Sequence, residues 1–156
     1  MRFNEARKLV KQLKRFDSQI SDMVTIMGVE AKNHFTNSFR IQGFEDETVK
    51  KWEPRKRNSY RTRGGKTVDD SSRGILIGKG SGTLRRSIQY RKMGKYKTMI
   101  STGGLKYAKI HNEGGMGRAF GKYSFKMKQR QFIGNSGKLN RKIINKIKSK
   151  INIIFA

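Results

Sequence analysis

The chain has 156 residues, and its 37 lysines and arginines against 11 aspartates and glutamates give a net charge of +26. This length suits one domain with a hydrophobic core, and the apolar runs fall far short of the ~20 residues that span a bilayer, so we expect a soluble protein without membrane contact. Cysteine is absent, which excludes disulfides and thiolate metal sites and fits a reducing cytoplasm, and the N-terminus lacks the apolar segment of a secretory signal.

The positive charge is concentrated after the first third of the chain. Residues 1–49 carry 8 basic and 7 acidic side chains, residues 50–100 carry 16 and 3, and residues 101–156 carry 13 and 1, which gives +1, +13 and +12. Charge of this sign attracts polyanions, either nucleic acid or an acidic protein surface, and it makes self-assembly costly unless such a partner neutralises it.

Residues 5–38 are predicted to form one long amphipathic helix. Apolar side chains recur at steps of three and four from Leu9 to Phe35, which is the spacing of one helical face. At 1.5 Å per residue this helix would be about 50 Å long, so we expect one end to project or the helix to bend. Gly28 is the expected bend, because glycine in a helix interior costs about 1 kcal/mol relative to alanine.

Residues 40–73 are predicted to be a loop that carries a basic arm, defined as residues 50–66. Residues 54–72 hold almost no apolar side chain, so they are expected to be mobile unless bound. The basic residues of the arm are Lys50, Lys51, Arg55, Lys56, Arg57, Arg61, Arg63 and Lys66.

Aromatic residues interrupt the basic arm at Trp52 and Tyr60. Basic side chains neutralise phosphates and aromatic rings can stack on exposed bases, so the arm is a candidate contact for DNA. An acidic neighbouring subunit would suit it equally well, and a solvated charged loop is the simplest alternative.

Residues 74–134 are predicted to form a small antiparallel sheet with a short helix. Ile88 and Tyr90 alternate with polar residues before a turn at residues 93–94, and Thr98 and Ile100 alternate after it. This pattern indicates a β-hairpin with one apolar face.

Further elements follow towards the C-terminus. A short helix around Ala108 precedes a glycine-rich loop at residues 114–121, and residues 123–127 alternate as a strand. Residues 135–154 are predicted to be a helix capped by Asn135 or Ser136. Together these elements predict a single α+β domain over residues 1–156.

The last apolar residues cannot all be buried by one helix. Ile153, Ile154 and Phe155 are consecutive, and consecutive side chains point in different directions around a helix. We expect this tail to form a subunit contact or, alternatively, a final strand of the sheet.

Two possible chemical sites are disfavoured by spacing. The segment Gly78-Lys79-Gly80-Ser81-Gly82 has Thr83 where the dinucleotide fingerprint needs glycine, and residues 85–112 contain no acidic residue. His111 and Glu113 lack the further ligands that a metal ion needs, because carboxylates are scarce beyond Asp70. We therefore expect no cofactor, no metal and no catalysis.

Three motifs in the second half of the chain are informative because of their order. They are Gly82-Thr83-Leu84-Arg85-Arg86-Ser87-Ile88, then Tyr107-Ala108-Lys109-Ile110-His111-Asn112-Glu113-Gly114-Gly115, then Arg130-Gln131-Phe132-Ile133-Gly134. Together with Phe39 and Trp52-Glu53-Pro54 upstream, they resemble the virion morphogenesis (tail completion) family of tailed bacteriophages from about Phe35 onward. The matching positions are Phe39, Trp52, Pro54, Gly82, Leu84, Ser87, Ile88, Tyr107, Ala108, His111, Gly114, Gly115, Arg130, Phe132 and Gly134.

The resemblance implies structural roles for these residues. Leu84, Ile88, Tyr107, Ala108 and Phe132 would fill the core, the glycines would permit sharp turns, and Arg130 would anchor a carboxylate or a carbonyl. Gln131 stands where the family often has proline, and Ile133 stands where it has leucine.

The resemblance also implies a place in the virion. It implies tail completion or head-tail joining at the neck or upper tail, as a ring, often sixfold, around the DNA path. The expected partners are further copies of the chain, connector, stopper or tail-tube proteins, and possibly DNA, with assembly in the host cytoplasm.

Two alternatives from other classes remain open at this point. One is a nucleic-acid-binding protein that uses the basic arm, whose affinity would fall steeply with salt. The other is a metal-dependent nuclease centred on His111 and Glu113.

Overall fold

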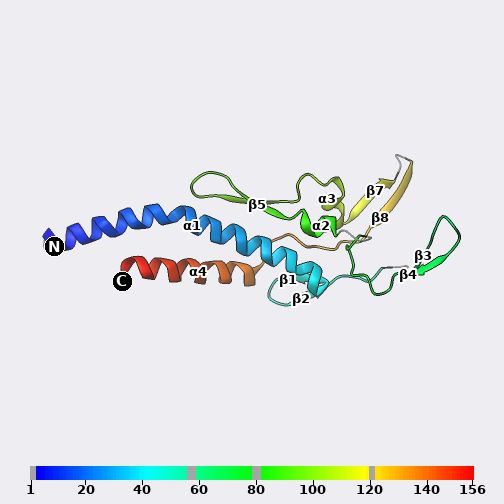
Figure 1. Cartoon of the computed structure of the whole chain (residues 1–156), viewed down its shortest axis with the longest axis horizontal. Helices are drawn as coiled ribbons and strands as arrows, with labels where there is room; N and C mark the ends of the chain where they lie inside the picture. Colours follow the sequence, from blue (N-terminus) through cyan, green and yellow to red (C-terminus); the bar gives the residue numbers. More distant parts are fainter. Residues whose placement is uncertain (1–2, 56–58, 79–81, 120–121) are drawn as a thin grey trace.

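The computed structural model describes residues 3–55, 59–78, 82–119 and 122–156. Over these residues the chain forms a long N-terminal helix, a series of two-stranded antiparallel hairpins, two short helices and a C-terminal helix (Figure 1). The predicted α+β class is therefore confirmed. No helix in these ranges is long and apolar enough to cross a membrane.

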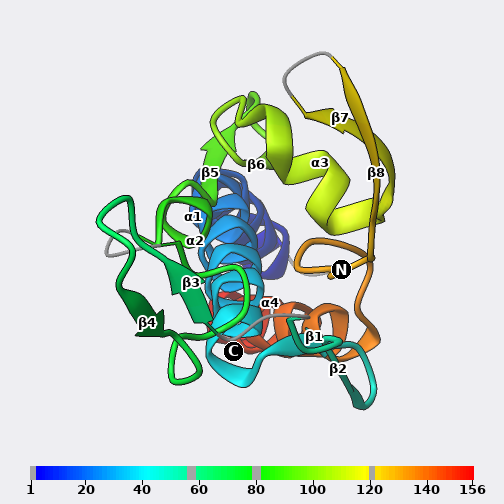
Figure 2. The same cartoon turned by 90° about the vertical axis from the view of Figure 1, so that its right-hand side faces the viewer.

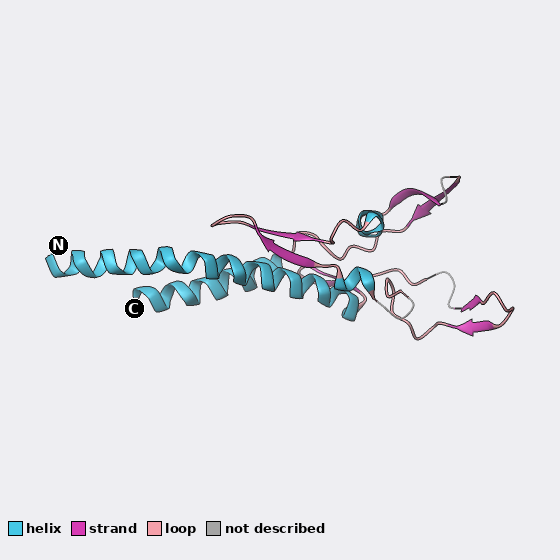
Figure 3. Ribbon diagram, turned by 45° about the horizontal axis from the view of Figure 1, so that its top comes forward, coloured by secondary structure: helices cyan, strands magenta, loops and turns pink. Residues whose placement is uncertain are grey.

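Two antiparallel helices lie side by side along the molecule (Figure 3). Helix α1, Phe3–Ile41, is slightly longer than the predicted 5–38, and its 39 residues span about 58 Å at 1.5 Å per residue. Helix α4 covers Gly137–Phe155. The Ser136 hydroxyl accepts a hydrogen bond from the Leu139 amide at 3.1 Å, so Ser136 is the N-cap of α4.

Ion pairs connect the two helices across their shared face. Glu30 of α1 is 6% exposed and lies between Lys142, whose Nζ is 2.9 Å from Oε2, and Lys146, which donates to Oε1. Further along, Lys150 Nζ lies 2.8 Å from Asp22 Oδ2. The hydrogen bonds from Lys146 and then Lys142 hold the pKa of Glu30 below its ordinary value, so this carboxylate stays ionised at neutral pH.

The first turns of α1 extend beyond the end of α4 (Figure 1). The last aromatic contact between the helices joins Phe16 and Phe155, with ring centroids 6.1 Å apart. The C-terminal tail is helical through Phe155, so the alternative of a final strand is wrong. Within it Ile154 is buried, while Ile153 is 65% exposed.

Gly28 is required by close packing. It is buried on α1, and a Cβ atom there would lie 2.4 Å from Cδ2 of Tyr90 and 2.9 Å from Oγ1 of Thr98. Both residues belong to the hairpin that crosses α1 at this point. The absence of a side chain lets the hairpin approach the helix, a role that the prediction of a bend at Gly28 did not foresee.

The predicted loop at residues 40–73 contains two short hairpins. Strand β1, Gly43–Glu45, pairs with β2, Val49–Lys51, and β3, Ser59–Arg61, pairs with β4, Thr67–Asp69. The loop prediction was therefore wrong over these strands. Each strand has three residues, and β2 is exposed at every position, so no alternation of apolar and polar residues marked it.

The predicted hairpin of residues 88–100 is confirmed as β5, Gln89–Lys92, paired with β6, Thr98–Ser101. It follows a single helical turn, α2, Thr83–Arg86, and precedes α3, Lys106–Glu113, which matches the predicted short helix.

The glycine-rich segment before the next strand forms a strand of its own. Strand β7, Gly115–Ala119, pairs with β8, Tyr123–Met127. Strand β8 was predicted with these bounds, whereas the loop predicted at residues 114–121 was wrong over β7. The described strands form separate two-stranded sheets, where the sequence suggested one small sheet.

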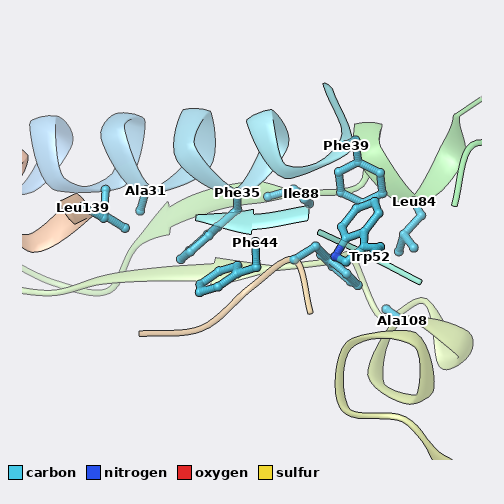
Figure 4. Packing of buried hydrophobic residues seen from close by; sticks show 10 residues of the cluster. Ala31, Phe35, Phe39, Phe44, Trp52, Leu84, Ile88, Ala108 and Leu139 are labelled. Carbon is cyan, nitrogen blue, oxygen red and sulfur yellow. The ribbon is translucent and has the colours of Figure 1, made fainter. Parts of the chain in front are cut away.

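The hydrophobic core collects residues from both halves of the chain (Figure 4). Side chains from α1 and β1 meet others from α2, α3 and α4. The core cluster consists of Ala31, Phe35, Phe39, Phe44, Trp52, Leu84, Ile88, Ala108, Phe132 and Leu139.

Replacing Gly28 with alanine should destabilise the protein. We expect Gly28→Ala to lower the free energy of unfolding by up to about 2 kcal/mol, because overpacking costs about 1–3 kcal/mol and is only partly offset by the gain of about 1 kcal/mol in helix propensity. Urea unfolding measures the effect. The loss should shrink in a Tyr90→Ala background, which removes the opposing ring, and a stabilised Gly28→Ala protein would show that the packing argument is wrong.

Neutralising Glu30 should destabilise the protein in a pH-dependent way. At pH 7 we expect Glu30→Gln to lower the free energy of unfolding by about 1 kcal/mol, a modest figure because both lysines are about half exposed to water. A carboxylate with a lowered folded pKa contributes fully above its unfolded pKa, about 4.3, and loses that contribution as the pH falls through the folded value. The difference between wild type and variant should therefore vanish at lower pH.

Unfolding curves of both proteins at neutral and acidic pH test this expectation. Glu113→Gln is the matched control, since the Glu113 carboxylate is 59% exposed and 4.0 Å from Lys109, and it should change stability little at either pH. A gap between Glu30→Gln and wild type that stayed constant with pH would contradict the assignment.

Candidate functional site

The family-motif residues meet around Trp52. Its indole Nε1 donates a hydrogen bond of 2.7 Å to the carbonyl of Gln131. The ring of Phe39 lies 5.4 Å from the Trp52 ring and 5.3 Å from that of Phe132, and Figure 4 shows Phe39 and Trp52 facing one another. Segments separated by about 80 residues are thus joined at one point.

Arg130 strengthens the same junction. Its Nε donates to the carbonyl of Glu53 at 3.1 Å and its Nη2 to that of Pro54 at 3.4 Å. Its backbone amide donates to the carbonyl of His111 at 2.8 Å. The guanidinium therefore lies on backbone carbonyls, one of the two roles that the resemblance implied for it.

Asn112 completes the junction and was missed by the sequence analysis. Its Oδ1 accepts hydrogen bonds of 2.9 Å from the amides of both Phe132 and Ile133. An amide side chain directly after His111 in the second motif was the available signal, because such side chains often satisfy nearby backbone groups.

The remaining motif residues lie where the chain turns or packs. Leu84, Ile88 and Ala108 are buried, but Tyr107, which was expected in the core, is 42% exposed. The ring of Tyr107 contacts that of His111 edge-on, with ring centroids 6.0 Å apart. The Ser87 hydroxyl donates to the carbonyl of Leu84 at 2.8 Å, at the C-terminal end of α2.

Three motif glycines have backbone conformations that favour glycine. Gly82, which precedes α2, has φ 54°, Gly114, which ends α3, has φ 75°, and the adjacent Gly115 has φ 108°. A Cβ on Gly114 would also lie 2.9 Å from the Gln129 amide nitrogen. Gly115 opens β7, and Gly134 packs against the Gln131 side chain.

The pair His111 and Glu113 does not form a metal site. Among the described residues no group of three His, Cys, Asp or Glu side chains lies close enough to hold an ion. Glu113 is directed to Lys109. Burial, together with the charge of Arg130, lowers the pKa of His111, so its imidazole is neutral at pH 7. This geometry gives no support to the nuclease alternative.

The basic arm is divided between anchored and exposed residues. Arg55 is anchored, because its Nη1 lies 2.8 Å from Asp70 Oδ2 and its Nη2 donates to the carbonyls of Asp70 and Arg73. Sequence analysis treated Arg55 as a free contact residue and overlooked Asp70, although Asp70 is among the few acids of this region. Lys56 and Arg57 lie outside the described residues.

The other arm residues are at the surface. Lys50 and Lys51 are exposed on β2, where the Lys51 ammonium donates to the Ile41 carbonyl at 2.7 Å. Arg61, Arg63 and Lys66 are exposed on the β3–β4 hairpin. Figure 2 shows this hairpin on one side of α1, with α3, β7 and β8 on the other.

Most side-chain carboxylates have a partner within the chain. All eleven acidic residues lie in the described ranges, and eight of them form ion pairs with lysine, arginine or histidine. Asp46 accepts from the Gly137 amide at 2.6 Å, Asp69 accepts from Ser71, and Glu5 also has an interaction partner. The net charge of +26 already counts all eleven acids, so it has to be neutralised from outside the chain.

Comparison with known proteins confirms the family that the motifs resemble. No curated protein and no solved structure matches the chain. The phage virion morphogenesis family, in contrast, matches residues 1–152. Since this match covers nearly the whole chain, including the helices, hairpins and motif junction described above, the protein belongs to the phage virion morphogenesis family, a family of structural proteins of the phage particle.

Proposed function

We propose that the protein completes the tail or joins it to the head, as a ring around the DNA path whose basic surface contacts an acidic neighbouring virion protein. The observation that carries this proposal is the net charge of +26, which already counts all eleven acidic side chains and so has to be neutralised from outside the chain. Family membership supports the setting in the virion.

Charge also argues for the order of assembly. Copies of a strongly basic chain repel one another at low ionic strength, and no free carboxylate offers a complementary surface. The ring therefore forms on its neighbour, which supplies the negative charge. Screening by salt should weaken the repulsion between free copies.

An acidic protein is a better partner for the basic surface than DNA. Basic side chains that face the DNA path would bind phosphates and hold the DNA in place, whereas DNA must pass through a neck. In addition, the exposed rings of Tyr96 and Tyr123 lie on separate hairpins, where they cannot stack successive bases as single-strand-binding surfaces do.

Removing charge from the exposed hairpin should block particle joining. We expect the triple variant Arg61→Ala, Arg63→Ala, Lys66→Ala to fold normally and to reduce the yield of complete particles at least about tenfold, because the contact loses three cations that each contribute a charge-assisted interaction. The measurement is complementation of a phage that lacks the gene, with infectious titre and electron microscopy of heads and tails as readouts.

A matched variant distinguishes the loss of a local contact at the hairpin from the effect of a lower net charge. Lys8→Ala, Lys11→Ala, Lys14→Ala removes the same charge from the exposed N-terminal part of α1 and should reduce the titre much less. Equal titres for the hairpin variant and wild type would contradict the role of the arm. Tight binding of the purified protein to a DNA duplex, lost in high salt and in the hairpin variant, would favour the nucleic-acid alternative.

A further inference from the structure

A cavity of about 430 Å³ lies between the basic arm and α3, and we call it the arginine pocket. Arg55, Arg73 and Arg130 line it together with Tyr107 and His111, and the segment 74–78 forms a further wall. The family motifs imply packing roles for the residues of this lining that they include, apart from Arg130, which they imply anchors a carboxylate or a carbonyl, and they name no external ligand for the cavity.

The charged part of the wall is positive and held in place. Arg55 and Arg73 both pair with Asp70, which is not part of the lining. Arg130 is fixed by the carbonyls of Glu53 and Pro54. Three guanidinium groups against one carboxylate leave an excess of positive charge at the cavity, and their fixed positions lower the entropic cost of binding an anion.

Two polar atoms of the wall have no hydrogen-bond partner. Nε of Arg73 and Nδ1 of His111 are both shielded from water and unpaired. A buried donor without an acceptor costs about 1–3 kcal/mol, and the guanidinium can only donate. A small rotation towards an acceptor held in the pocket would satisfy Nε of Arg73, and it would also satisfy Nδ1 of His111 in the tautomer that carries the ring proton on this nitrogen.

The opposite part of the wall is apolar. Ile75, Leu76 and Ile77 line it, together with Leu84 and Met127. Leu76 has φ 59°, a left-handed conformation that is costly for a branched side chain, and such strain tends to occur at binding sites. A concave wall that is half apolar suits a carboxylate beside an apolar side chain, whereas the phosphates of duplex DNA are displayed on the outside of a rod.

We propose that the arginine pocket binds a carboxylate of an acidic, partly apolar peptide segment from a neighbouring virion protein. This inference rests on the proposed function, because it names the chemistry of the contact that the joining role requires. The guanidinium groups bind the carboxylate, and the segment 74–78 packs against the adjacent apolar side chain.

Binding of a minimal peptide to the isolated full-length protein tests this proposal. The probe is acetyl-leucyl-glutamate, and the readout is nuclear magnetic resonance of the arginine Nε–H groups and of the His111 ring. We expect saturable shifts at Arg73 and His111 with a millimolar dissociation constant, as is usual for so small a ligand. The neutral analogue acetyl-leucyl-glutamine should bind at least about tenfold more weakly, since it lacks the charge-assisted hydrogen bonds.

Variants locate the site. Arg73→Gln should weaken binding of acetyl-leucyl-glutamate by about tenfold, whereas Arg86→Gln, the same change on an exposed α2 residue outside the lining, should leave it unchanged. Leu76→Gly relieves the strained backbone without touching a charge and serves as a second variant if Arg73→Gln fails to fold. It should weaken binding of the leucyl probe while preserving discrimination against the glutamine analogue.

Several outcomes would overturn the proposal. These are equal binding of the two peptides, unchanged binding in Arg73→Gln, and occupation of the pocket by inorganic phosphate or a DNA duplex in preference to acetyl-leucyl-glutamate. Because the assay contains no other virion protein, its result is independent of the complementation assay. The peptide assay can therefore succeed while the complementation assay shows that the hairpin is dispensable for joining, and the reverse can also occur. The failure of one proposal is thus distinguishable from the failure of the other.

Discussion

The structure depends on one aromatic junction, where Phe39, Trp52 and Phe132 pack together and the Trp52 indole donates to the Gln131 carbonyl. Each two-stranded hairpin alone is at best marginally stable in water. The β1–β2 and β5–β6 hairpins pack against α1, and the junction joins the segments around residues 52–54 and 130–133 beside the C-terminal half of that helix. Aromatic packing and hydrogen bonds to backbone carbonyls need no acidic side chains, so the centre of the fold is independent of the scarce carboxylates.

Those carboxylates act at the periphery. Glu30 and Asp22 form ion pairs between α1 and α4. Asp70 pairs with Arg55 of the basic arm, and Glu47 pairs with Arg141 beside β2. Exposed ion pairs contribute little to the free energy of unfolding individually. Each of these pairs, however, also neutralises one of the few negative charges of the chain. The unpaired surplus is consequently positive over the surface, and an external polyanion becomes a condition of close assembly.

The sequence predicted the elements whose apolar residues recur with a regular period or whose ends carry a capping residue. The α1 stripe, the β5–β6 hairpin, β8, α3 and the Ser136 cap followed from periodicity and from capping chemistry. The short strands β2 and β7 could not be predicted, because β2 is exposed on both faces and β7 is rich in glycine. The arginine pocket was equally hidden, because it depends on Arg55, Arg73 and Arg130 approaching through the tertiary fold.

The two ends of the molecule expose different kinds of residue, and the excess of positive charge affects both ends (Figure 1). The hairpin end carries fixed arginines and exposed basic strands. At the other end α1 runs past Phe155 with Leu9, Val10 and Leu13 exposed, on a helix whose polar face is mostly basic. Exposed apolar residues in a row favour association, yet like charges beside them oppose pairing with an identical copy. The hairpin end is therefore the part of the molecule that favours an acidic partner, whereas the projecting end of α1 combines exposed apolar residues with charge that opposes pairing between identical copies.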